Sequence, residues 1–299
     1  MSKKVKKRLI LAGAGIFCLL LILLQLLGER GRGQLYEALE LHPRRECSPW
    51  SVTVLDVGQG QGVLIRTAGH AVLVDCGEAE AAPRVLSALD RYSIRRLDAA
   101  VVTHLHSDHM GAMGEVLREV SANTFWIPQQ AEPQDDLSRQ LFTDLQNLGI
   151  PVEHPSPGDQ LYLGEGVALK VLGPVRAYSE ANNQSMVLLV TTPQGNILLC
   201  GDMQKQAEAD LLAAKADVKA DVLVVGHHGS ATSTSEEFLK AVSPKIAVLS
   251  VGWSNFYGLP DNTVIGRLEE SGIRVVSTDL DGEITIAPRD GHLEVLTQK

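Results

Sequence analysis

Three imidazoles and a carboxylate lie within six residues, in the segment His104-Leu105-His106-Ser107-Asp108-His109. Core packing does not explain this spacing, because buried imidazoles would leave many polar atoms in need of partners. His104 and His106 can share one side of a turn and bind one metal ion, while Asp108 and His109 on the next turn face a second. Imidazole and carboxylate ligands suit Zn²⁺, Mn²⁺ or Fe. The segment therefore predicts a metal site.

A further carboxylate follows a later apolar run. Asp202 comes directly after residues 196–200 and Gly201, so it leaves the end of an expected strand. Its carboxylate could bridge two cations about 3.5–4 Å apart. It could instead cap the helix expected at residues 204–215, since Asp is a favoured residue at helix N-termini. The residue pattern leaves both roles open.

Two more imidazoles and another carboxylate occupy similar positions at strand ends. His227 and His228 follow the apolar residues 222–225, and Asp75 ends the run at residues 71–75. We expect one of the two histidines to bind metal while the other contacts a phosphate or acts as a general acid. Asp75 could orient a metal-bound histidine through its second ring nitrogen. It could equally form a turn with the glycine that follows two residues later.

The elements that would carry these residues alternate between strands and helices. Apolar and β-rich runs predict strands at residues 52–57, 63–67, 71–75, 99–103, 168–172, 186–192, 196–200, 222–225, 246–251 and 283–287. Helices are expected at residues 81–92, 110–120, 135–148, 204–215, 235–242 and 262–271. The first three strands are separated by short turns, as in a meander. We predict an α/β fold, an αββα sandwich of two stacked sheets with helices outside, over residues 51–299.

The N-terminal part has the pattern of a membrane anchor. Residues 1–8 carry five basic side chains, and residues 9–27 are apolar or small apart from Gln25. Nineteen residues of helix span about 28 Å, enough to cross a hydrocarbon core. The alternative is a cleaved signal peptide, but the run lacks a small-x-small cleavage site. We predict a cytoplasmic segment, a transmembrane helix and a linker at residues 28–50, with the remaining domain outside the membrane.

Composition excludes several classes of protein. The 299 residues are 44% hydrophobic and 21% charged, which is a globular balance, and four cysteines are too few for a disulfide scaffold. The net charge is −9, but residues 1–33 hold seven basic groups and one acidic group, which leaves −15 for residues 34–299. Such acidity disfavours nonspecific binding of a polyanion, because that affinity comes mostly from Lys and Arg.

The full His-x-His-x-Asp-His pattern at residues 104–109 resembles the signature of the metallo-β-lactamase fold superfamily. Further motifs are similar to those of the extracellular hydrolase-like domain of ComEC-type DNA-uptake proteins. They are Asp56-Val57-Gly58-Gln59-Gly60, Asp75-Cys76-Gly77, Asn182-Asn183-Gln184-Ser185, Gly201-Asp202, Gly226-His227-His228-Gly229-Ser230 and Tyr257-Gly258-Leu259-Pro260. The resemblance covers residues 51–287, over three quarters of the chain.

The resemblance implies two divalent cations, Zn²⁺ or Mn²⁺, with Asp202 as the ligand that bridges them. It places Asn183, Ser185 and Ser230 in contact with ligand residues or substrate. It also implies that the substrate is DNA, with one strand handled during uptake.

Several positions depart from the family pattern. Many superfamily hydrolases have a further histidine ligand between Asp108 and Asp202, where this chain has the Asn182 motif. Leu259 stands where ComEC-type proteins usually have histidine, and Asp261 could substitute for it. Gln61 likewise stands where the subfamily often has Asp. These departures put occupancy of the second metal site, or the rate, in question without threatening the fold.

The leading hypothesis is metal-assisted hydrolysis of a phosphodiester, with single-stranded DNA as the expected substrate. Asp108 would orient the attacking hydroxide, and His227 or His228 would stabilise the leaving oxygen. The acidic domain fits a small or cell-wall phosphoester equally well. The second hypothesis, from a different class, is a catalytically weak binding module of the same fold, which the loss of a histidine at Leu259 favours and the intact 104–109 cluster opposes. A β-lactamase is the third hypothesis, and the Asn-x-x-Ser and His-His-Gly-Ser patterns point away from it.

Overall fold

The computed structural model describes residues 48–299 of the chain. The predicted cytoplasmic segment, the anchor at residues 9–27 and nearly all of the linker lie outside the described residues. Among residues 48–299, no helix has the length and apolar character needed to cross a membrane. Strand β1 begins at Trp50, a buried residue that the sequence analysis assigned to the end of the linker.

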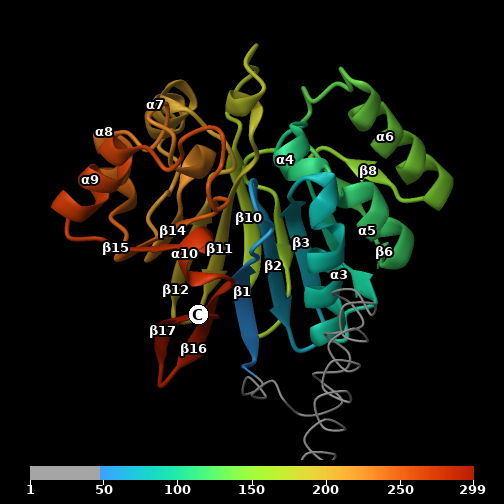
Figure 1. Cartoon of the computed structure of the whole chain (residues 1–299), viewed down its shortest axis with the longest axis horizontal. Helices are drawn as coiled ribbons and strands as arrows, with labels where there is room; N and C mark the ends of the chain where they lie inside the picture. The colour runs from blue at the N-terminus through green and yellow to red at the C-terminus, as the bar shows by residue number, and fades with distance from the viewer. Residues whose placement is uncertain (1–47) are drawn as a thin grey trace, which may run out of the picture.

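Two sheets are stacked face to face, with helices on their outer sides (Figure 1). The first sheet has the order β17 (His292–Thr297), β16 (Ile284–Arg289), β1 (Trp50–Val54), β2 (Gly62–Thr67), β3 (Ala71–Cys76), β5 (Ala99–Val101), β7 (Phe125–Trp126) and β8 (Val152–Glu153). The second has the order β15 (Arg274–Ser277), β14 (Ile246–Leu249), β13 (Val222–Val224), β12 (Gly195–Leu199), β11 (Val187–Thr192), β10 (Ala168–Gly173) and β9 (Gln160–Tyr162). A small third sheet pairs β4 (Arg96–Leu97) with β6 (Ser121–Ala122). The predicted αββα layers are confirmed.

Helices cover the outer faces of both sheets. The first sheet is covered by α3 (Ala82–Arg91), α4 (Ser107–Met110), α5 (Met113–Glu119) and α6 (Asp136–Leu148), and the second by α7 (Lys205–Ala213), α8 (Glu236–Val242) and α9 (Asn262–Glu270), with the short α10 (Thr278–Asp281) beside β15. The best-defined ends belong to α6. Its N-cap Asp135 accepts a hydrogen bond from the Ser138 amide at 2.7 Å, and it ends at Gly149 with a φ of 67°. Left-handed backbone at this position favours glycine.

Each sheet is antiparallel in one half and parallel in the other. Strands β1, β2 and β3 form the predicted antiparallel meander. Strands β3, β5, β7 and β8 then run parallel, and so do β12, β13, β14 and β15 in the second sheet. Parallel neighbours need crossover connections, which the helices supply. The carboxyl ends of these strands therefore emerge at one edge of their sheet, where loops can carry polar side chains.

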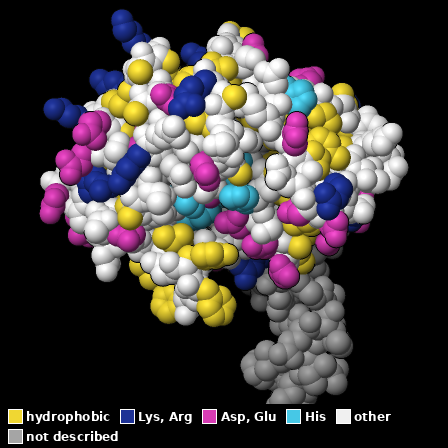
Figure 2. All heavy atoms as spheres, turned by 90° about the horizontal axis from the view of Figure 1, so that it is seen from above, with side chains coloured by type: hydrophobic (Ala, Val, Ile, Leu, Met, Phe, Trp, Pro, Cys, Tyr) yellow, Lys and Arg dark blue, Asp and Glu magenta, His cyan; other side chains and the backbone are white. Residues whose placement is uncertain are grey.

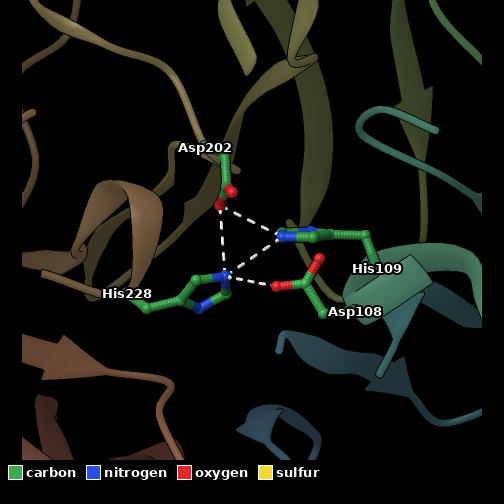
Figure 3. A group of neighbouring side chains, drawn as sticks. All are labelled: Asp108, His109, Asp202 and His228. Carbon is green, nitrogen blue, oxygen red and sulfur yellow. Dashed lines mark hydrogen bonds and ion pairs between the residues drawn. The ribbon is translucent and has the colours of Figure 1, made fainter. Parts of the chain in front are cut away.

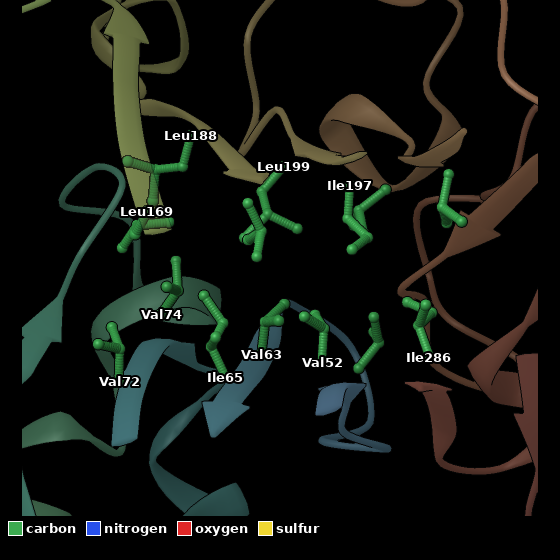
Figure 4. Packing of buried hydrophobic residues seen from close by; sticks show 14 of the residues in the cluster. Val52, Val63, Ile65, Val72, Val74, Leu169, Leu188, Ile197, Leu199 and Ile286 are labelled. Atoms are coloured by element: carbon green, nitrogen blue, oxygen red, sulfur yellow. The ribbon is translucent and has the colours of Figure 1, made fainter. Parts of the chain in front are cut away.

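The space between the sheets is filled by side chains that alternate along each strand. Val63 and Ile65 of β2 point toward the second sheet, whereas Leu64 between them packs under the outer helices. Figure 4 shows side chains of the first sheet facing Leu188, Leu199 and their neighbours across this layer. This is the two-residue period of a strand that is buried on both faces. Cys76 and Cys200 are buried free thiols on the outward faces.

Some short elements differ from the prediction. Where one helix was expected at residues 110–120, α4 ends at Met110 and α5 begins at Met113. Gly111 between them packs against the backbone of residues 78 and 79, where no side chain fits. Strands β4, β6, β7, β8, β9, β15 and β17 were not predicted from the sequence. Most are edge strands or two-residue strands, whose apolar pattern is too brief to stand out.

The layer between the sheets should dominate the free energy of unfolding. Leu188 is fully buried there, so Leu188→Ala should lower the free energy of unfolding by about 2–5 kcal/mol through lost burial and a cavity. The matched control is Leu148, which is 41% exposed at the end of α6. Leu148→Ala should change the free energy of unfolding by about 0.5 kcal/mol. Urea denaturation of the purified chain measures both, and equal losses would contradict this view of the core.

Candidate metal centre

The candidate ligands converge because they follow parallel strands of both sheets. The segment with His104 and His106 follows β5 of the first sheet. Asp202 follows β12, and His227 and His228 follow β13, in the second sheet. Stacking the sheets brings these carboxyl ends to one rim of the sandwich. The pattern of chemistry at strand ends that the sequence predicted is therefore brought together by the fold.

One donor group contains Asp108, His109, Asp202 and His228, and its four ligand atoms lie within 4.8 Å of one another. Figure 3 shows the four side chains directing their polar atoms toward a common point. His228 Nε2 lies 3.1 Å from Asp108 Oδ2 and 3.3 Å from His109 Nε2. Asp202 Oδ1 lies 3.0 Å from His109 Nε2 and 3.4 Å from His228 Nε2. Two imidazoles and two carboxylates are a donor set suited to a divalent transition metal.

A second donor group contains His104, His106 and again Asp202. His104 Nε2 lies 3.0 Å from His106 Nδ1 and 3.7 Å from Asp202 Oδ2. The two oxygens of Asp202 therefore face different groups. The alternative role of Asp202 as a helix cap does not occur, because Gln204 occupies the N-cap position of α7. The arrangement fits a carboxylate shared between two cations.

Asp75 fixes the orientation of His109. Its Oδ2 accepts a hydrogen bond from His109 Nδ1 at 2.8 Å, which leaves Nε2 free to face the donor group. The amide and hydroxyl of Thr103 and the side-chain amide of Gln61 donate three further hydrogen bonds to the same carboxylate, at 2.7–2.8 Å. Asp75 is fully buried. Of the two predicted roles, the geometry favours the one that orients a histidine.

His228 and His104 also have partners for their second ring nitrogen. His228 Nδ1 donates to the backbone carbonyl of Ser250 at 2.8 Å. His104 Nδ1 lies 3.3 Å from the hydroxyls of Thr103 and Ser185. Ser185 Oγ also accepts a hydrogen bond from the Asp202 amide at 3.0 Å, so it links ligands of both sheets. Such partners hold each imidazole in one orientation and present the other nitrogen to the centre.

The charges of the cluster are strongly coupled. Although burial acts to raise it, the imidazoles of His109 and His228 hold the pKa of the Asp202 carboxyl well below its ordinary value. Burial acts to lower the pKa of His109, but the carboxylates of Asp202 and Asp75 outweigh it and raise that pKa well above its ordinary value. Burial and the neighbouring His109 lower the pKa of His104 well below its ordinary value. The cluster therefore favours positive charge next to its buried carboxylates.

One buried oxygen supports the fit to a metal. Asp202 is only 2% exposed, and its Oδ1 has no hydrogen bond from any of the described residues. Its close neighbours are the Nε2 atoms of His109 and His228, whose Nδ1 atoms already hold protons for other acceptors. With a cation bound, both imidazoles would be neutral, and in this tautomer their Nε2 lone pairs would face the same point as Asp202 Oδ1, as those of metal ligands do. The residues present therefore fit a divalent cation.

The turn that carries His227 and His228 is unusual in its backbone. Both residues have a φ of 52°, in the left-handed region that non-glycine residues seldom adopt. Gly229 follows with a φ of 81°, and a Cβ there would meet Pro260 at 2.8 Å. This turn directs His228 into the first donor group. His227 stays outside both groups, with its Nε2 3.7 Å from Asp202 Oδ2 and its side chain 22% exposed.

A loop of the first sheet packs against the centre from the other side. Gly60 has a φ of 114°, and a Cβ there would meet the Asp108 carbonyl oxygen at 2.0 Å. The Gln61 amide donates to that same carbonyl at 3.0 Å, and Ser250 Oγ donates to the Gly60 carbonyl at 2.9 Å. The Asp56-Val57-Gly58-Gln59-Gly60 motif therefore joins the Asp108 turn to the Ser250 loop.

Four other predicted positions lie outside the donor groups. Asn183 is buried, and its Oδ1 accepts from the Gln204 amide at 3.1 Å. Ser230 Oγ lies 2.9 Å from Thr232 Oγ1. Asp261 caps α9 by accepting from the amide and hydroxyl of Thr263, and is in neither donor group. Leu259 packs partly buried against the core beside α8 and α9, so an apolar side chain stands where the motif resemblance implies a histidine.

The sequence analysis missed the residues that complete the surroundings of the ligands. Asn182, one position before the predicted Asn183, donates to His227 Nε2 at 3.4 Å. Its Oδ1 is buried and has no partner among the described residues. The 3₁₀ turn Asn182–Gln184 decides which asparagine faces the centre, and the motif alone does not reveal it. Thr103 and the Ser250 carbonyl were also missed, since hydroxyls and backbone carry no signature in sequence.

Metal binding should be visible as thermal stabilisation. A cation that binds only the folded chain adds about 2.7 kcal/mol of stability at a hundredfold excess over its dissociation constant. We expect Mn²⁺ or Zn²⁺ to raise the unfolding temperature of the chain and a chelator to reverse this. Asp202→Asn keeps the side-chain shape and should remove most of the rise. Asp136→Asn, at a fully exposed carboxylate on α6, should keep it. An equal rise in both variants would contradict the assignment.

Asp75 should act on metal affinity without being a ligand. In Asp75→Asn, the new side-chain amide would present NH₂ where His109, Thr103 or Gln61 now donate, so metal binding should weaken by about 10- to 100-fold. Asp144→Asn is the control, because Asp144 is also buried and paired, with Arg118 Nη2 at 2.7 Å, and it lies between α5 and α6 in neither donor group. Calorimetric titration with Mn²⁺ measures both. Unchanged affinity in Asp75→Asn would show that Asp75 only supports the fold.

Known proteins are similar to this chain in sequence and in fold. ComE operon protein 3 of Bacillus subtilis (strain 168) is 31% identical over 258 residues, which are 79% of this chain and 33% of that protein. Competence protein ComA of Neisseria gonorrhoeae is 34% identical over 272 residues, 89% of this chain and 37% of that protein. The chain thus spans about a third of the length of these curated relatives. The predicted resemblance to ComEC-type competence proteins is confirmed.

The fold comparison agrees with the sequence comparison. The crystal structure of the metallo-beta-lactamase fold protein YhfI from Bacillus subtilis matches with a TM-score of 0.54 at 14% identity, covering 77% of this chain and 97% of that chain. The sequence model of the metallo-beta-lactamase superfamily matches residues 55–253, a range that contains both donor groups. The chain belongs to the metallo-beta-lactamase superfamily.

Proposed function

We propose that the chain is a metal-dependent phosphodiester hydrolase that acts on DNA outside the membrane. The observation that carries this proposal is the pair of donor groups that share Asp202. Two cations that lie close together suit the displacement of an oxygen at phosphorus, because they would lower the pKa of a bound water and offset charge on the phosphoryl oxygens. His104, His106 and Asp202 would hold one cation, and Asp108, His109, His228 and Asp202 the other.

The remaining polar side chains have positions suited to substrate. Asp108 is 20% exposed, so its carboxylate faces both the donor group and solvent, where it can accept a hydrogen bond from the attacking water. His227 lies outside both donor groups, and its Nδ1 lies 2.9 Å from Thr232 Oγ1, which fixes the ring. We assign to His227 the contact with a phosphoryl or leaving oxygen. Asn182 lies beside His227 and would share that contact.

DNA as the substrate is supported by the relatives rather than by the charge of the chain. Two relatives are named as competence or competence-operon proteins, and the motif resemblance is to the hydrolase-like domain of DNA-uptake proteins. The predicted anchor at residues 9–27 would place the centre outside the membrane, where incoming DNA is met. We include this location in the proposal.

A small or cell-wall phosphodiester is the second candidate substrate. The charge of −15 over residues 34–299 favours it, since a long polyanion gains little attraction from such a surface. Both substrates would use the same cations and the same side chains. DNA needs a protein surface that contacts the nucleotides on either side of the cleaved bond, whereas a small diester does not. Turnover measured on each substrate decides between them.

The hydrolase is tested with bis-(p-nitrophenyl) phosphate and single-stranded DNA, each with Mn²⁺ or Zn²⁺. We expect turnover on both, and a loss of at least about 100-fold in His106→Ala, since removing a ligand should cost at least as much as removing its hydrogen-bond partner. His292→Ala, at an exposed position on β17, is the control and should retain full turnover.

Each other outcome identifies a different function. Hydrolysis of the small diester without cleavage of DNA would favour the second candidate substrate. Absence of turnover on both, together with DNA binding that survives His106→Ala, would indicate a binding module. Turnover that is unchanged in His106→Ala would refute the proposed centre itself.

A further inference from the structure

Exposed aromatic side chains are concentrated in one loop beside the metal centre. The chain has only three Trp, five Tyr and five Phe, and several of them, such as Trp50 and Phe125, are buried. Yet Trp253 and Tyr257 are 73% and 72% exposed, and Phe256 is fully exposed. We call residues 250–261 the aromatic loop. Figure 2 shows hydrophobic side chains protruding on the same face of the molecule as the visible histidines.

The aromatic loop is held in one shape by its own hydrogen bonds. The Asn255 side chain donates to the carbonyls of Gly252 at 3.0 Å and Leu259 at 2.7 Å. It also accepts from the amides of Tyr257 at 3.2 Å and Leu259 at 3.1 Å. A loop fixed in this way loses little conformational entropy when its side chains bind a ligand. Exposed aromatic rings on a rigid loop are therefore suited to binding.

Both ends of the aromatic loop are attached to the turn that carries a candidate metal ligand. At its start, the Ser250 carbonyl accepts from His228 Nδ1 at 2.8 Å. At its end, the Asp261 amide donates to the Gly229 carbonyl at 2.9 Å. Trp253 is three residues from Ser250, which limits the backbone distance between them to about 11 Å. The groups attached to a phosphodiester bound at the metal centre would therefore lie close to the aromatic rings.

A pocket of about 590 Å³ lies between the aromatic loop and the neighbouring β1–β2 loop. Trp253, Phe256 and Asn255 line one side of it, and Gln59 and Arg84 line the other. The aromatic loop has no charged residue between Ser250 and Asp261. The pocket also contains Asp56 and Asp279, which offset its basic side chains. The site can therefore receive part of a polyanion without strong charge attraction or repulsion.

We propose that Trp253, Phe256 and Tyr257 form a stacking platform for the unpaired bases that flank the phosphodiester bound at the metal centre. This inference rests on the proposed function and adds the means by which an acidic protein binds a nucleic-acid strand. Every base has a π-face, and stacking on aromatic side chains contributes affinity without Lys or Arg. A lipid surface would also contact exposed aromatic rings, but the polar pocket wall at Gln59 and Asn255 fits a base edge better than acyl chains.

Intrinsic tryptophan fluorescence provides a direct test. Trp50 and Trp126 are buried, so Trp253 is the exposed tryptophan of the three in the chain. The full chain is titrated with a single-stranded oligodeoxythymidine in chelator, so that no cleavage occurs. The platform predicts a saturable fall in fluorescence that is absent with an oligomer of the same length whose bases are removed. It also predicts weak salt dependence, with a slope of log affinity against log salt shallower than about −1.

Substitutions separate stacking from general effects on the fold. Trp253→Ala and Phe256→Ala should each weaken oligodeoxythymidine binding by about 5- to 100-fold, measured by fluorescence anisotropy of a labelled oligomer. Trp253→Phe keeps an aromatic ring and should retain most of the affinity. Tyr162→Ala is the matched control, because Tyr162 is 68% exposed on β9, near the β2–β3 turn at the opposite end of the strands. Thermal unfolding confirms that each variant is folded.

The outcomes distinguish this proposal from the hydrolase. If wild-type chain hydrolyses bis-(p-nitrophenyl) phosphate but Trp253→Ala and Phe256→Ala bind the oligomer as tightly as wild type, the platform is wrong and the hydrolase stands. If wild type hydrolyses nothing but these variants lose binding, the platform stands and the hydrolase is wrong. Equal affinity for the oligomer without bases, or variants that lose only binding to phosphatidylcholine vesicles, would overturn the platform.

Discussion

The centre depends on one buried carboxylate. Asp202 is 2% exposed, and its two oxygens face separate groups of imidazoles. A buried charge is costly unless opposite charge lies beside it. In the chain alone, the raised pKa of His109 supplies part of that charge, and a cation in each donor group would supply it more fully. Asp75 accepts a hydrogen bond from His109, and the Ser250 carbonyl accepts one from His228. These hydrogen bonds hold both imidazoles with their other ring nitrogen directed at Asp202.

This constraint explains the shape of the fold. The donors around Asp202 come from both sheets, so the site exists only where the two sheets are stacked. Here β5 of the first sheet and the pair β12 and β13 of the second end at the same rim. The antiparallel halves of both sheets contribute no donor to either group. They extend the apolar layer between the sheets. This layer holds the two sheets, and so the loops that carry the donors, in fixed positions.

Much of this arrangement could be predicted from the sequence, and the exceptions have physical reasons. The spacing of residues 104–109 and the acidic or imidazole residues after apolar runs revealed the centre, since such patterns are local. The choice between Asn182 and Asn183 depends on the phase of a 3₁₀ turn, which the motif does not determine. Asp261 was considered as a substitute for the histidine missing at Leu259, but its carboxylate caps α9, as short acidic side chains before helices commonly do. Edge strands such as β9 and β17 were missed because tertiary pairing, rather than pattern, defines them.

The backbone of His227 and His228 sets stability against function. Left-handed conformations cost an ordinary residue roughly 1–2 kcal/mol, and two such residues stand in succession here. Glycine would relax the backbone of the turn, and asparagine would ease it. A chain selected for stability alone would therefore not keep imidazoles at these positions. The strained turn lowers the free energy of unfolding but directs the His228 side chain into the donor group. Substitutions that stabilise the turn would therefore remove a side chain that the metal centre needs.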